Sequence, residues 1–499
     1  MAGGNVQGGK DMGNRPPIRI LLLSILITCV LYGACVRNPV TGKRQLALMS
    51  ESQEVAMGQA SHPEVLSEFG MVDSEDLQLY FSRIGNDLAR VSHRPNLPWQ
   101  FTVVDSPVVN AFAVPGGYIY LTRGILEHMN NEAELAGVLG HEIGHVTARH
   151  SVTQISQGQL MNLGLGVGSI LSPTFQQLGG LAQMGLEVLM LKYSRDHERE
   201  SDQLGLQYMA KCGYDPEQMS RFFQVFIGMR EEGDQSIPNW LSSHPSPPDR
   251  IKNTSAEASR IKSTSPPRDY KINAEVFMPK LDRLIYGENP REGFVENGRF
   301  VHPDLRFQFD VPPGWKVENT KSSVVFNEPE GGAMVQLTMV PPDAGGSPGE
   351  VAQKIAQSQG TQFLSGSNER INGNQAFLGL YRLQSQSGNI GVTAGFISYG
   401  GRIYQIAGLA PEATFSRYSR PMSSVVRSFR ELTDTRLLAV QPDRMKLYRA
   451  RKGDSLRSIA RSIDQTRISL DDLVRINRMH PDQALSEGTW VKLVQPGRR

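Results

Sequence analysis

Hydrophobic and polar positions divide the chain into a helical first half and a strand-rich later part. Apolar residues recur at helical spacing from about residue 50 to 90, opposite a face of Gln, Glu and Ser, which predicts amphipathic helix. The clearest helix is expected from Asn131 to His150, because Asn131 can cap it and Glu134 follows three residues on. Further elements are expected as helices over 193–211 and after Asp215-Pro216, and as strands over 100–104 (QFTVV) and 118–122 (YIYLT), which flank the turn sequence Pro115-Gly116-Gly117.

The pattern changes further along the chain. The apolar, glycine-rich segment 158–191 is expected to form a helical hairpin over a functional site. The Ser-, Thr- and Pro-rich segment 253–269 is expected to end the first domain. From about 300 to 432, short alternating runs predict strands, with helices near 349–358 and 412–429, and together they predict a small α+β domain. The C-terminal region predicts two short helices between short strands.

Composition and charge argue against one class of function. The 499 residues are 39% hydrophobic, and 52 Lys and Arg against 50 Asp and Glu leave a net charge of +2. This balance gives no field that attracts nucleic acid, and there is no basic stripe with interleaved aromatic residues. We therefore expect no nucleic-acid partner.

The N-terminus predicts export. Three basic residues precede an apolar run, Ile20–Cys35, that is short for a membrane span. Gly33 and Ala34 before Cys35 resemble a bacterial lipobox, in which Cys35 is lipidated and becomes the mature N-terminus, although Tyr32 stands where such boxes usually carry Leu. The alternative is an uncleaved signal anchor. Only Cys212 then remains in the mature fold, which excludes a disulfide framework.

A candidate metal site lies on the helix after Asn131. His141-Glu142-Ile143-Gly144-His145 follows the pattern H-E-x-x-H. Residues four apart differ by about 40° around a helix, so His141 and His145 project from one face and can share a metal ion. Glu142 can reach a metal-bound water and take its proton. The motif predicts one zinc ion per chain, and a surface helix with two satisfied histidines is the alternative.

A catalytic zinc ion needs a third protein ligand. A histidine ten residues after the first is excluded, because Ser151 occupies that position and His150 is out of phase. A later helix carries Glu198 and Asp202 on one face; Glu198 can bind the metal, and Asp202 can orient a ligating histidine or assist proton transfer. On the same helix, His197 is a second possible ligand off that face, and Glu200 points away and is expected to be solvated.

These motifs resemble the gluzincin metallopeptidase family of the prenyl-CAAX proteases, HtpX and BepA. The resemblance rests on H-E-x-x-H and on the later pattern S-R-x-x-E-x-x-x-D, and it covers about residues 36–260. Ser201 stands where the family usually has Ala. Because the chain lacks the several apolar spans of the membrane members, it is most similar to the soluble, exported lipoprotein branch. Supporting segments are Asn110–Gly117, Ser243-His244-Pro245, Asp249-Arg250-Ile251, and Asn38–Arg44 after Cys35.

Pattern and resemblance together imply an α+β protein. Residues 1–35 are expected to form the signal or anchor, and residues 36–268 a mainly helical zincin domain with a small sheet. A small α+β domain is expected over 290–435 and a βααβ module over 446–495. The resemblance implies that the family's roles apply at the matching positions: His141, His145 and Glu198 hold zinc, Glu142 is the base and Asp202 the proton donor. His244 and Arg250 are candidates for stabilising the oxyanion. His244 can instead take the fourth zinc position at rest and keep the enzyme shut.

The C-terminal segment resembles a LysM module, a fold that binds N-acetylglucosamine polymers. Gly453-Asp454-Ser455-Leu456 and the closing Gly488-Thr489-Trp490-Val491 carry the resemblance. It implies peptidoglycan as a partner of residues 448–494, and an interaction domain without glycan affinity is the alternative.

The sequence thus predicts a zinc endopeptidase that cleaves unfolded or misassembled envelope proteins. It is expected to face the periplasm of a bacterial cell, tethered to the membrane at Cys35 or by the 20–35 segment. The uncharged stretch Asn110–Val114 is expected to be an edge strand that pairs with extended substrates. Alternative functions are an envelope protein-assembly chaperone with conditional or minor proteolysis and a peptidoglycan-binding adaptor.

Overall fold

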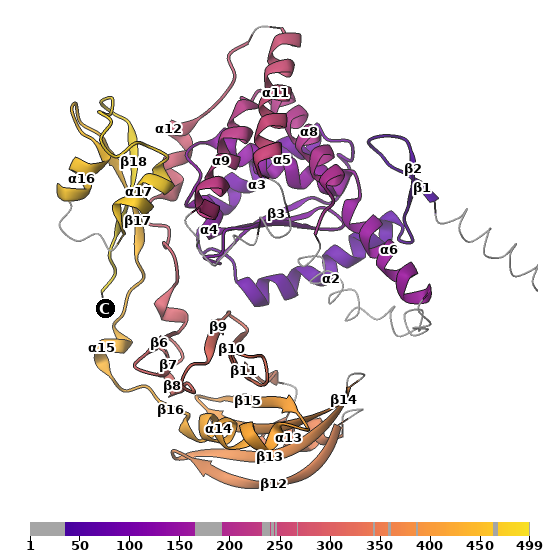
Figure 1. The fold of residues 1–499 in the computed structure, drawn as a ribbon, viewed down its shortest axis with the longest axis vertical. Helices are drawn as coiled ribbons and strands as arrows, with labels where there is room; N and C mark the ends of the chain where they lie inside the picture. The colour runs from indigo at the N-terminus through magenta and orange to yellow at the C-terminus, as the bar shows by residue number, and fades with distance from the viewer. Residues whose placement is uncertain are drawn as a thin grey trace, which may run out of the picture.

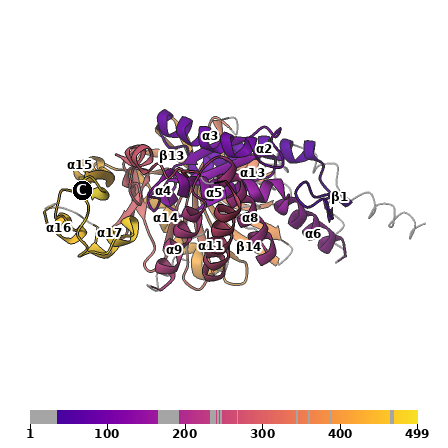
Figure 2. The same cartoon turned by 90° about the horizontal axis from the view of Figure 1, so that it is seen from above.

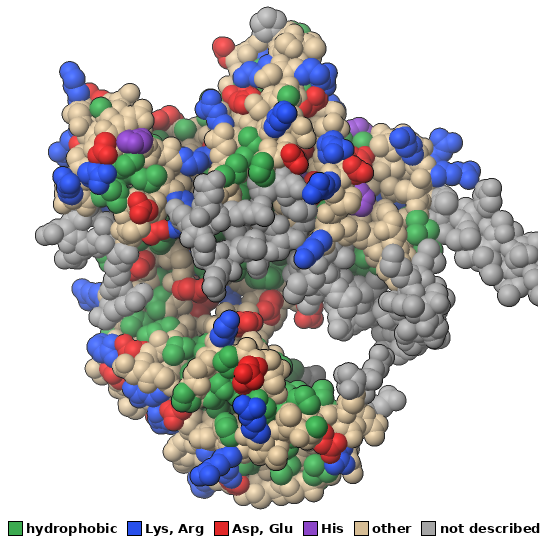
Figure 3. Space-filling model, viewed as in Figure 1, with side chains coloured by type: hydrophobic (Ala, Val, Ile, Leu, Met, Phe, Trp, Pro, Cys, Tyr) green, Lys and Arg blue, Asp and Glu red, His purple; other side chains and the backbone are tan. Residues whose placement is uncertain are grey.

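The computed structural model describes residues 35–164, 192–231, 240, 244, 247–266, 268–342, 345–357, 361–385, 388–462 and 468–498. They form a helical domain, a sheet domain below it in Figure 1, and a small C-terminal module beside the helical domain. The α+β prediction is confirmed. Charged side chains of both signs are interspersed over the face in Figure 3. Within the described ranges, every helix is too short or too polar to span a bilayer.

The first domain packs its helices on a three-stranded sheet. The strand order is β3 (Gln100–Val104), β5 (Tyr118–Thr122), β4 (Ala111–Val114); β3 runs parallel and β4 antiparallel to β5, so β4 is an end strand. A hairpin of β1 (Cys35–Arg37) and β2 (Arg44–Leu46) precedes the helices. The helices are α2 (Glu51–Phe69), α3 (Glu75–Arg90), α4 (Arg123–Leu126), α5 (Glu132–Thr147), α6 (His150–Gly164), α8 (Arg195–Lys211), α9 (Glu217–Glu231) and α11 (Pro247–Thr264).

Helix α5 lies at the centre of this domain, and every one of its residues is buried. Asn131 caps it as expected, since its Oδ1 accepts a hydrogen bond from the backbone N of Glu134 at 2.9 Å. The helix ends at Thr147 instead of His150. The reason is Arg149, whose φ of 61° is left-handed and turns the chain, so that His150 begins α6.

Glycines bring α5 and α8 into close contact. A Cβ on Gly140 would lie 3.0 Å from the Cα of Gly205, and a Cβ on Gly205 would lie 2.9 Å from the backbone N of His141. One turn further along α5, a Cβ on Gly144 would lie 3.0 Å from the Cα of Ser201. A larger side chain at any of these glycines would push the two helices apart.

The amphipathic helix expected over 50–90 is confirmed, with a break within it. The pattern over 50–90 forms two helices, because Gly70 takes a φ of 67° at the end of α2 and Ser74 caps α3. The segment 253–269, expected to end the first domain, is helical up to Thr264. Its composition is polar, but Thr254, Ala258 and Ile261 recur at helical spacing and are buried. Of the hairpin expected over 158–191, the last turns of α6 are seen and residues 165–191 lie outside the described residues.

The second domain has a seven-stranded sheet between two helices. Ile406 packs in one cluster with Met422 of α14 (Phe415–Ser428), whereas its neighbour Ala407 packs with Val351 of α13 (Pro348–Ala356). Adjacent strand residues point to opposite faces, so the helices cover opposite faces. The sheet order is β12 (Thr361–Ile371), β13 (Asn374–Ser385), β14 (Gly388–Tyr399), β15 (Arg402–Pro411), β11 (Met334–Met339), β10 (Ser323–Asn327), β9 (Lys316–Asn319).

A smaller sheet and several short helices complete the second domain and its connections. The smaller sheet has the order β16 (Arg430–Glu431), β8 (Phe307–Asp310), β7 (Arg299–His302), β6 (Phe294–Glu296). The short helices are α12 (Ala274–Phe277), η3 (Met278–Leu281), η4 (Pro290–Glu292) and α15 (Thr435–Leu438).

The C-terminal module is docked on the segment that leads into α5. It has the expected βααβ order: β17 (Arg444–Arg449), α16 (Leu456–Ser462), α17 (Leu470–Asn477) and β18 (Trp490–Gln495). Lys492 of β18 is buried, and its Nζ donates to the carbonyl oxygens of Glu127 and Met129 at 2.7 and 3.0 Å. Arg478 forms an ion pair with Glu134 in the first turn of α5.

The N-terminal hairpin contacts the other end of α5. Asn38 donates from Nδ2 to the carbonyl oxygen of Ala148 at 3.2 Å, and Arg149 donates from Nη2 to the carbonyl oxygen of Met49 at 2.7 Å. In Figures 1 and 2 the hairpin and the C-terminal module lie on opposite sides of the helical domain.

Replacing the buried lysine is expected to weaken this docking. Lys492→Met leaves two buried carbonyl groups without their donor, which should lower the free energy of unfolding by about 1–3 kcal/mol. Urea denaturation measures the loss. The control is Lys446→Met on the exposed side of β17, which should change it by less than about 0.5 kcal/mol. Equal midpoints for the two variants would contradict the docking role.

Candidate metal centre

Helix α5 presents two buried imidazoles on one face. The Nε2 atoms of His141 and His145 lie 3.0 Å apart, and the two rings are nearly perpendicular at 77°. This is the geometry that positions four apart on a helix allow. Their ring nitrogens therefore converge on one point.

Two further donors come from other elements. Glu198, in the first turn of α8, has Oε1 3.4 Å from Nε2 of His145 and Oε2 3.7 Å from Nε2 of His141. His244, ahead of α11, has Nδ1 2.9 Å from Oε1 of Glu198 and 3.2 Å from Nε2 of His141. The four side chains, all buried, offer donor atoms within 4.8 Å of one another.

This donor set fits zinc. Imidazole nitrogens and a carboxylate oxygen are ligands that zinc takes, and tetrahedral bonds of about 2.0–2.1 Å place such donors roughly 3.3 Å apart. Neighbouring donors in the cluster lie between 2.9 and 3.7 Å apart. A cation also offsets the repulsion between the carboxylate and the ring lone pairs. We refer to His141, His145, Glu198 and His244 as the donor cluster.

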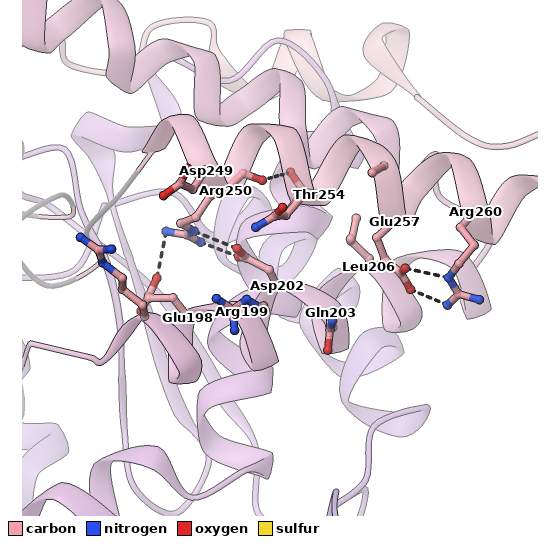
Figure 4. Close-up of a pocket in the computed structure, with 13 residues that line it drawn as sticks. Glu198, Arg199, Asp202, Gln203, Leu206, Asp249, Arg250, Thr254, Glu257 and Arg260 are labelled. Carbon is pink, nitrogen blue, oxygen red and sulfur yellow. Dashed lines mark hydrogen bonds and ion pairs between the residues drawn. The ribbon is translucent and has the colours of Figure 1, made fainter.

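Asp202 and Arg250 support the donor cluster from one side. Asp202 is one turn beyond Glu198, and its Oδ1 lies 2.9 Å from Nδ1 of His141. Arg250 of α11 donates from Nε to Oδ2 of Asp202 at 2.8 Å and places Nη1 2.9 Å from Oε2 of Glu198. Figure 4 shows this guanidinium between the two carboxylates. Asp202 can thus hold His141 with its Nε2 lone pair facing the cluster.

The contacts of Arg250 differ from those of an oxyanion donor. Its guanidinium is buried, is engaged with both carboxylates, and lies over the rings of Phe223 and Trp240 at 4.3 and 4.7 Å. These contacts favour a role in orienting Glu198 and Asp202 over direct contact with a substrate.

Burial keeps the histidines of α5 neutral. Loss of solvent, with the nearby Arg250 charge, lowers the pKa of His141 well below its ordinary value, and burial does the same for the pKa of His145. For Glu198, burial alone would raise the pKa, but His244 and Arg250 outweigh it and hold the pKa well below its ordinary value. Neutral imidazoles and an ionised carboxylate are the forms that bind a metal ion.

Glu142 lies beside the cluster with different properties. Burial raises the pKa of Glu142 to about 7, the range suited to a general base. Its Oε1 has no hydrogen-bond partner within the described part of the chain and lies 3.7 Å from Nε2 of His244. The carboxylate is thus close to the donors without being one of them.

Several side chains at the centre were not expected from the sequence. Tyr193 packs its ring on His145 with centroids 3.9 Å apart, and Trp240 stacks on His244 at 4.9 Å. Glu200, expected to be solvated, is only partly exposed, and its Oε2 lies 3.0 Å from Nε2 of His150. His197 lies outside the donor cluster and stacks on His150. A signal for His150 existed in the sequence, as a histidine close after the H-E-x-x-H motif.

Comparison with known families agrees with this geometry. Residues 75–258 match the profile of Peptidase family M48, and residues 448–493 match the profile of the LysM domain. Both resemblances inferred from the motifs are therefore confirmed. Because this peptidase family is zinc-dependent and the donor cluster is present, the predicted zinc cofactor is confirmed as well.

Several curated proteins are similar to the chain. The beta-barrel assembly-enhancing protease of Yersinia pestis is 29% identical over 242 residues, covering 46% of this chain and 50% of that protein. The mitochondrial metalloendopeptidase OMA1 of Arabidopsis thaliana is 35% identical over 164 residues, covering 33% and 32%. The OMA1 of Schizosaccharomyces pombe is 30% identical over 218 residues, covering 43% and 64%. The chain thus spans from 32% to 64% of the length of these relatives.

Likeness to solved structures is weak. The solution structure of cyanobacterial PsbP from Synechocystis aligns with 27% of this chain and 91% of that chain, at 16% identity and a TM-score of 0.23. This level of likeness supports no functional statement.

Zinc binding is expected to depend on Glu198. A ligand at a hundred times its dissociation constant stabilises a fold by about 2.7 kcal/mol, so zinc should raise the melting temperature of the metal-free protein. Glu198→Ala should remove most of this increase, whereas Glu257→Ala, in the same groove between α8 and α11, should retain it. Scanning calorimetry with and without zinc measures both. An undiminished increase in Glu198→Ala would contradict the assignment.

Proposed function

We propose that this chain, whose residues 75–258 form a Peptidase family M48 domain, is a zinc-dependent endopeptidase that cleaves unfolded or misassembled envelope proteins. The observation that carries the proposal is the buried cluster of His141, His145 and Glu198 with Glu142 beside it. The substrate class is supported by relatives whose name is beta-barrel assembly-enhancing protease.

The side chains divide the chemistry among them. His141, His145 and Glu198 would hold the zinc ion, which when bound polarises a peptide carbonyl and makes water more acidic. Glu142 accepts a proton from the attacking water and returns it to the nitrogen of the leaving peptide. Its raised pKa, about 7, suits both steps, because the carboxylate and the acid are then nearly equal in energy. Asp202, held by Arg250, orients His141.

His244 is proposed to close the site at rest. A catalytic zinc ion keeps one position for water or substrate besides its three protein ligands. His244 brings a fourth donor atom into the cluster, 2.9 Å from Glu198. A peptide could then enter only when His244 leaves. The alternative role, donation of a hydrogen bond to the oxyanion, predicts the opposite effect of removing the side chain.

Extended segments are proposed to bind along β4. This strand ends the sheet order and pairs only with β5 among the described strands. Backbone pairing at such an edge recognises an extended chain with little sequence preference. That property suits unfolded substrates.

The metallopeptidase proposal is tested by casein cleavage. Glu142→Gln should lower kcat/KM by about 10²–10⁴-fold because it removes the general base, and a chelator should abolish wild-type activity. Glu64→Gln on the exposed side of α2 is the matched control and should cleave like wild type. Equal cleavage by Glu142→Gln and wild type would exclude the protease and favour the assembly chaperone.

The resting role of His244 gives a distinct expectation. His244→Ala removes the fourth donor, so casein cleavage should rise severalfold while zinc is bound less tightly. Paired kinetics and zinc titration measure both quantities. A fall in kcat with unchanged zinc affinity would instead assign His244 to the oxyanion.

Peptidoglycan binding by the LysM domain is the second part of the proposal. The match over residues 448–493 supports it. The wild-type protein should sediment with insoluble peptidoglycan and be released by N-acetylglucosamine oligomers, and a chain truncated before residue 446 should stay in the supernatant. Equal sedimentation of both would leave the module as an interaction domain without glycan affinity.

Membrane attachment at Cys35, facing the periplasm, completes the proposed placement of the protein. It rests on the basic and apolar N-terminal sequence and on the lipobox-like residues before Cys35. Cys35→Ser should move the protein from the membrane fraction to the soluble fraction of a bacterial host. Retention in the membrane fraction would favour the signal anchor at 20–35.

A further inference from the structure

The two histidines of α5 are supported from behind by different groups. Nδ1 of His141 faces a carboxylate oxygen of Asp202 at 2.9 Å. Nδ1 of His145 faces another imidazole, Nδ1 of His150, at 3.0 Å, and both rings are buried. A contact between two ring nitrogens is a hydrogen bond only when one of them carries a proton and the other does not.

The surroundings of His150 decide which nitrogen carries the proton. Nε2 of His150 lies 3.0 Å from Oε2 of Glu200, and an ionised carboxylate only accepts hydrogen bonds, so Nε2 is protonated. In a neutral ring Nδ1 is then an acceptor. The hydroxyl of Ser201, 3.3 Å from the same Nδ1, can donate to it as well.

The acceptor state of His150 also determines which nitrogen of His145 in the donor cluster carries the lone pair. If Nδ1 of His150 accepts, Nδ1 of His145 must donate, and the lone pair of His145 is then on Nε2. That nitrogen lies 3.0 Å from Nε2 of His141 and 3.4 Å from Glu198. We propose that Glu200 and His150 form a hydrogen-bond chain, here called the relay, that fixes the tautomer of His145. In that tautomer the lone pair on Nε2 of His145 is available to bind zinc. His150 and Glu200 are positioning residues, and this assignment rests on the proposed zinc site.

The local fold explains why His150 reaches this place. Arg149 takes a φ of 61°, so the chain turns after α5 and the first residue of α6 folds back on His145. His197 stacks on the ring of His150 with centroids 4.2 Å apart and planes at 15°. Glu200 keeps 26% of its side chain exposed, so it can be changed without opening the core.

The relay is tested by zinc affinity of the full chain, measured by competition with a chromophoric chelator. His150→Phe keeps an aromatic ring but removes the acceptor, and loss of such a partner typically weakens metal binding by 10–100-fold. Glu200→Met, which cannot accept a hydrogen bond, should weaken binding in the same direction. Glu200→Gln should restore it, because the amide oxygen can accept from Nε2 of His150.

His197→Phe is the matched control, because it keeps the stacked ring, and His197 makes no hydrogen bond to a zinc ligand among the described residues. It should bind zinc within about twofold of wild type. The absorption bands of the Co2+-loaded protein should shift in His150→Phe and Glu200→Met but not in His197→Phe.

The outcomes separate this inference from the proposed function. Wild-type affinity and an unchanged Co2+ spectrum in Glu200→Met would overturn the relay alone, even if His150→Phe does not fold. A weakening in Glu200→Gln equal to that in Glu200→Met would also overturn it, because charge and not hydrogen bonding would then be responsible. Failure of the wild-type protein to bind zinc would overturn both the relay and the proposed function.

Discussion

The site depends on the close contact between α5 and α8. Gly140 and Gly205 face each other where the helices meet, and a Cβ on either would come within 3.0 Å of the opposite backbone. Because the backbones approach so closely, the short side chains of Glu198 and Asp202 reach His141 directly. Two regular helices therefore fix four of the groups at the centre, and a small change in their separation would alter every distance among them.

Burying so many ionisable groups is unfavourable unless they are paired. Glu198, Asp202 and Arg250 are all buried, and each is within hydrogen-bonding or ion-pair distance of at least one of the others. Removing one member would leave the others charged in a poorly solvating environment, which costs more than the pair contributes. The support of the metal site is thus also part of the domain's core, and zinc binding and folding are linked through the same residues.

The sequence predicted the parts of the site that follow helical periodicity. His141 and His145, and separately Glu198 and Asp202, are four apart within single helices, so one rule places each pair. Helical phase with α5 does not place His150, because the left-handed Arg149 turns the chain and His150 begins α6. Trp240 lies in a polar region with no periodic signal, and the contacts of Lys492 join parts far apart in the sequence. The polar composition of 247–264 also gives little sign of α11. Its buried face follows only from the helical spacing of Thr254, Ala258 and Ile261.

Helix α5 is held at both ends by parts of the chain distant in sequence. Asn38 contacts the carbonyl of Ala148 just past its C-terminal end, and Arg478 contacts Glu134 in its first turn. A helix of 16 residues is about 24 Å long, and its backbone hydrogen bonds run along its axis. A pull applied between the N-terminal hairpin and the C-terminal module would therefore be transmitted along the helix that carries His141 and His145.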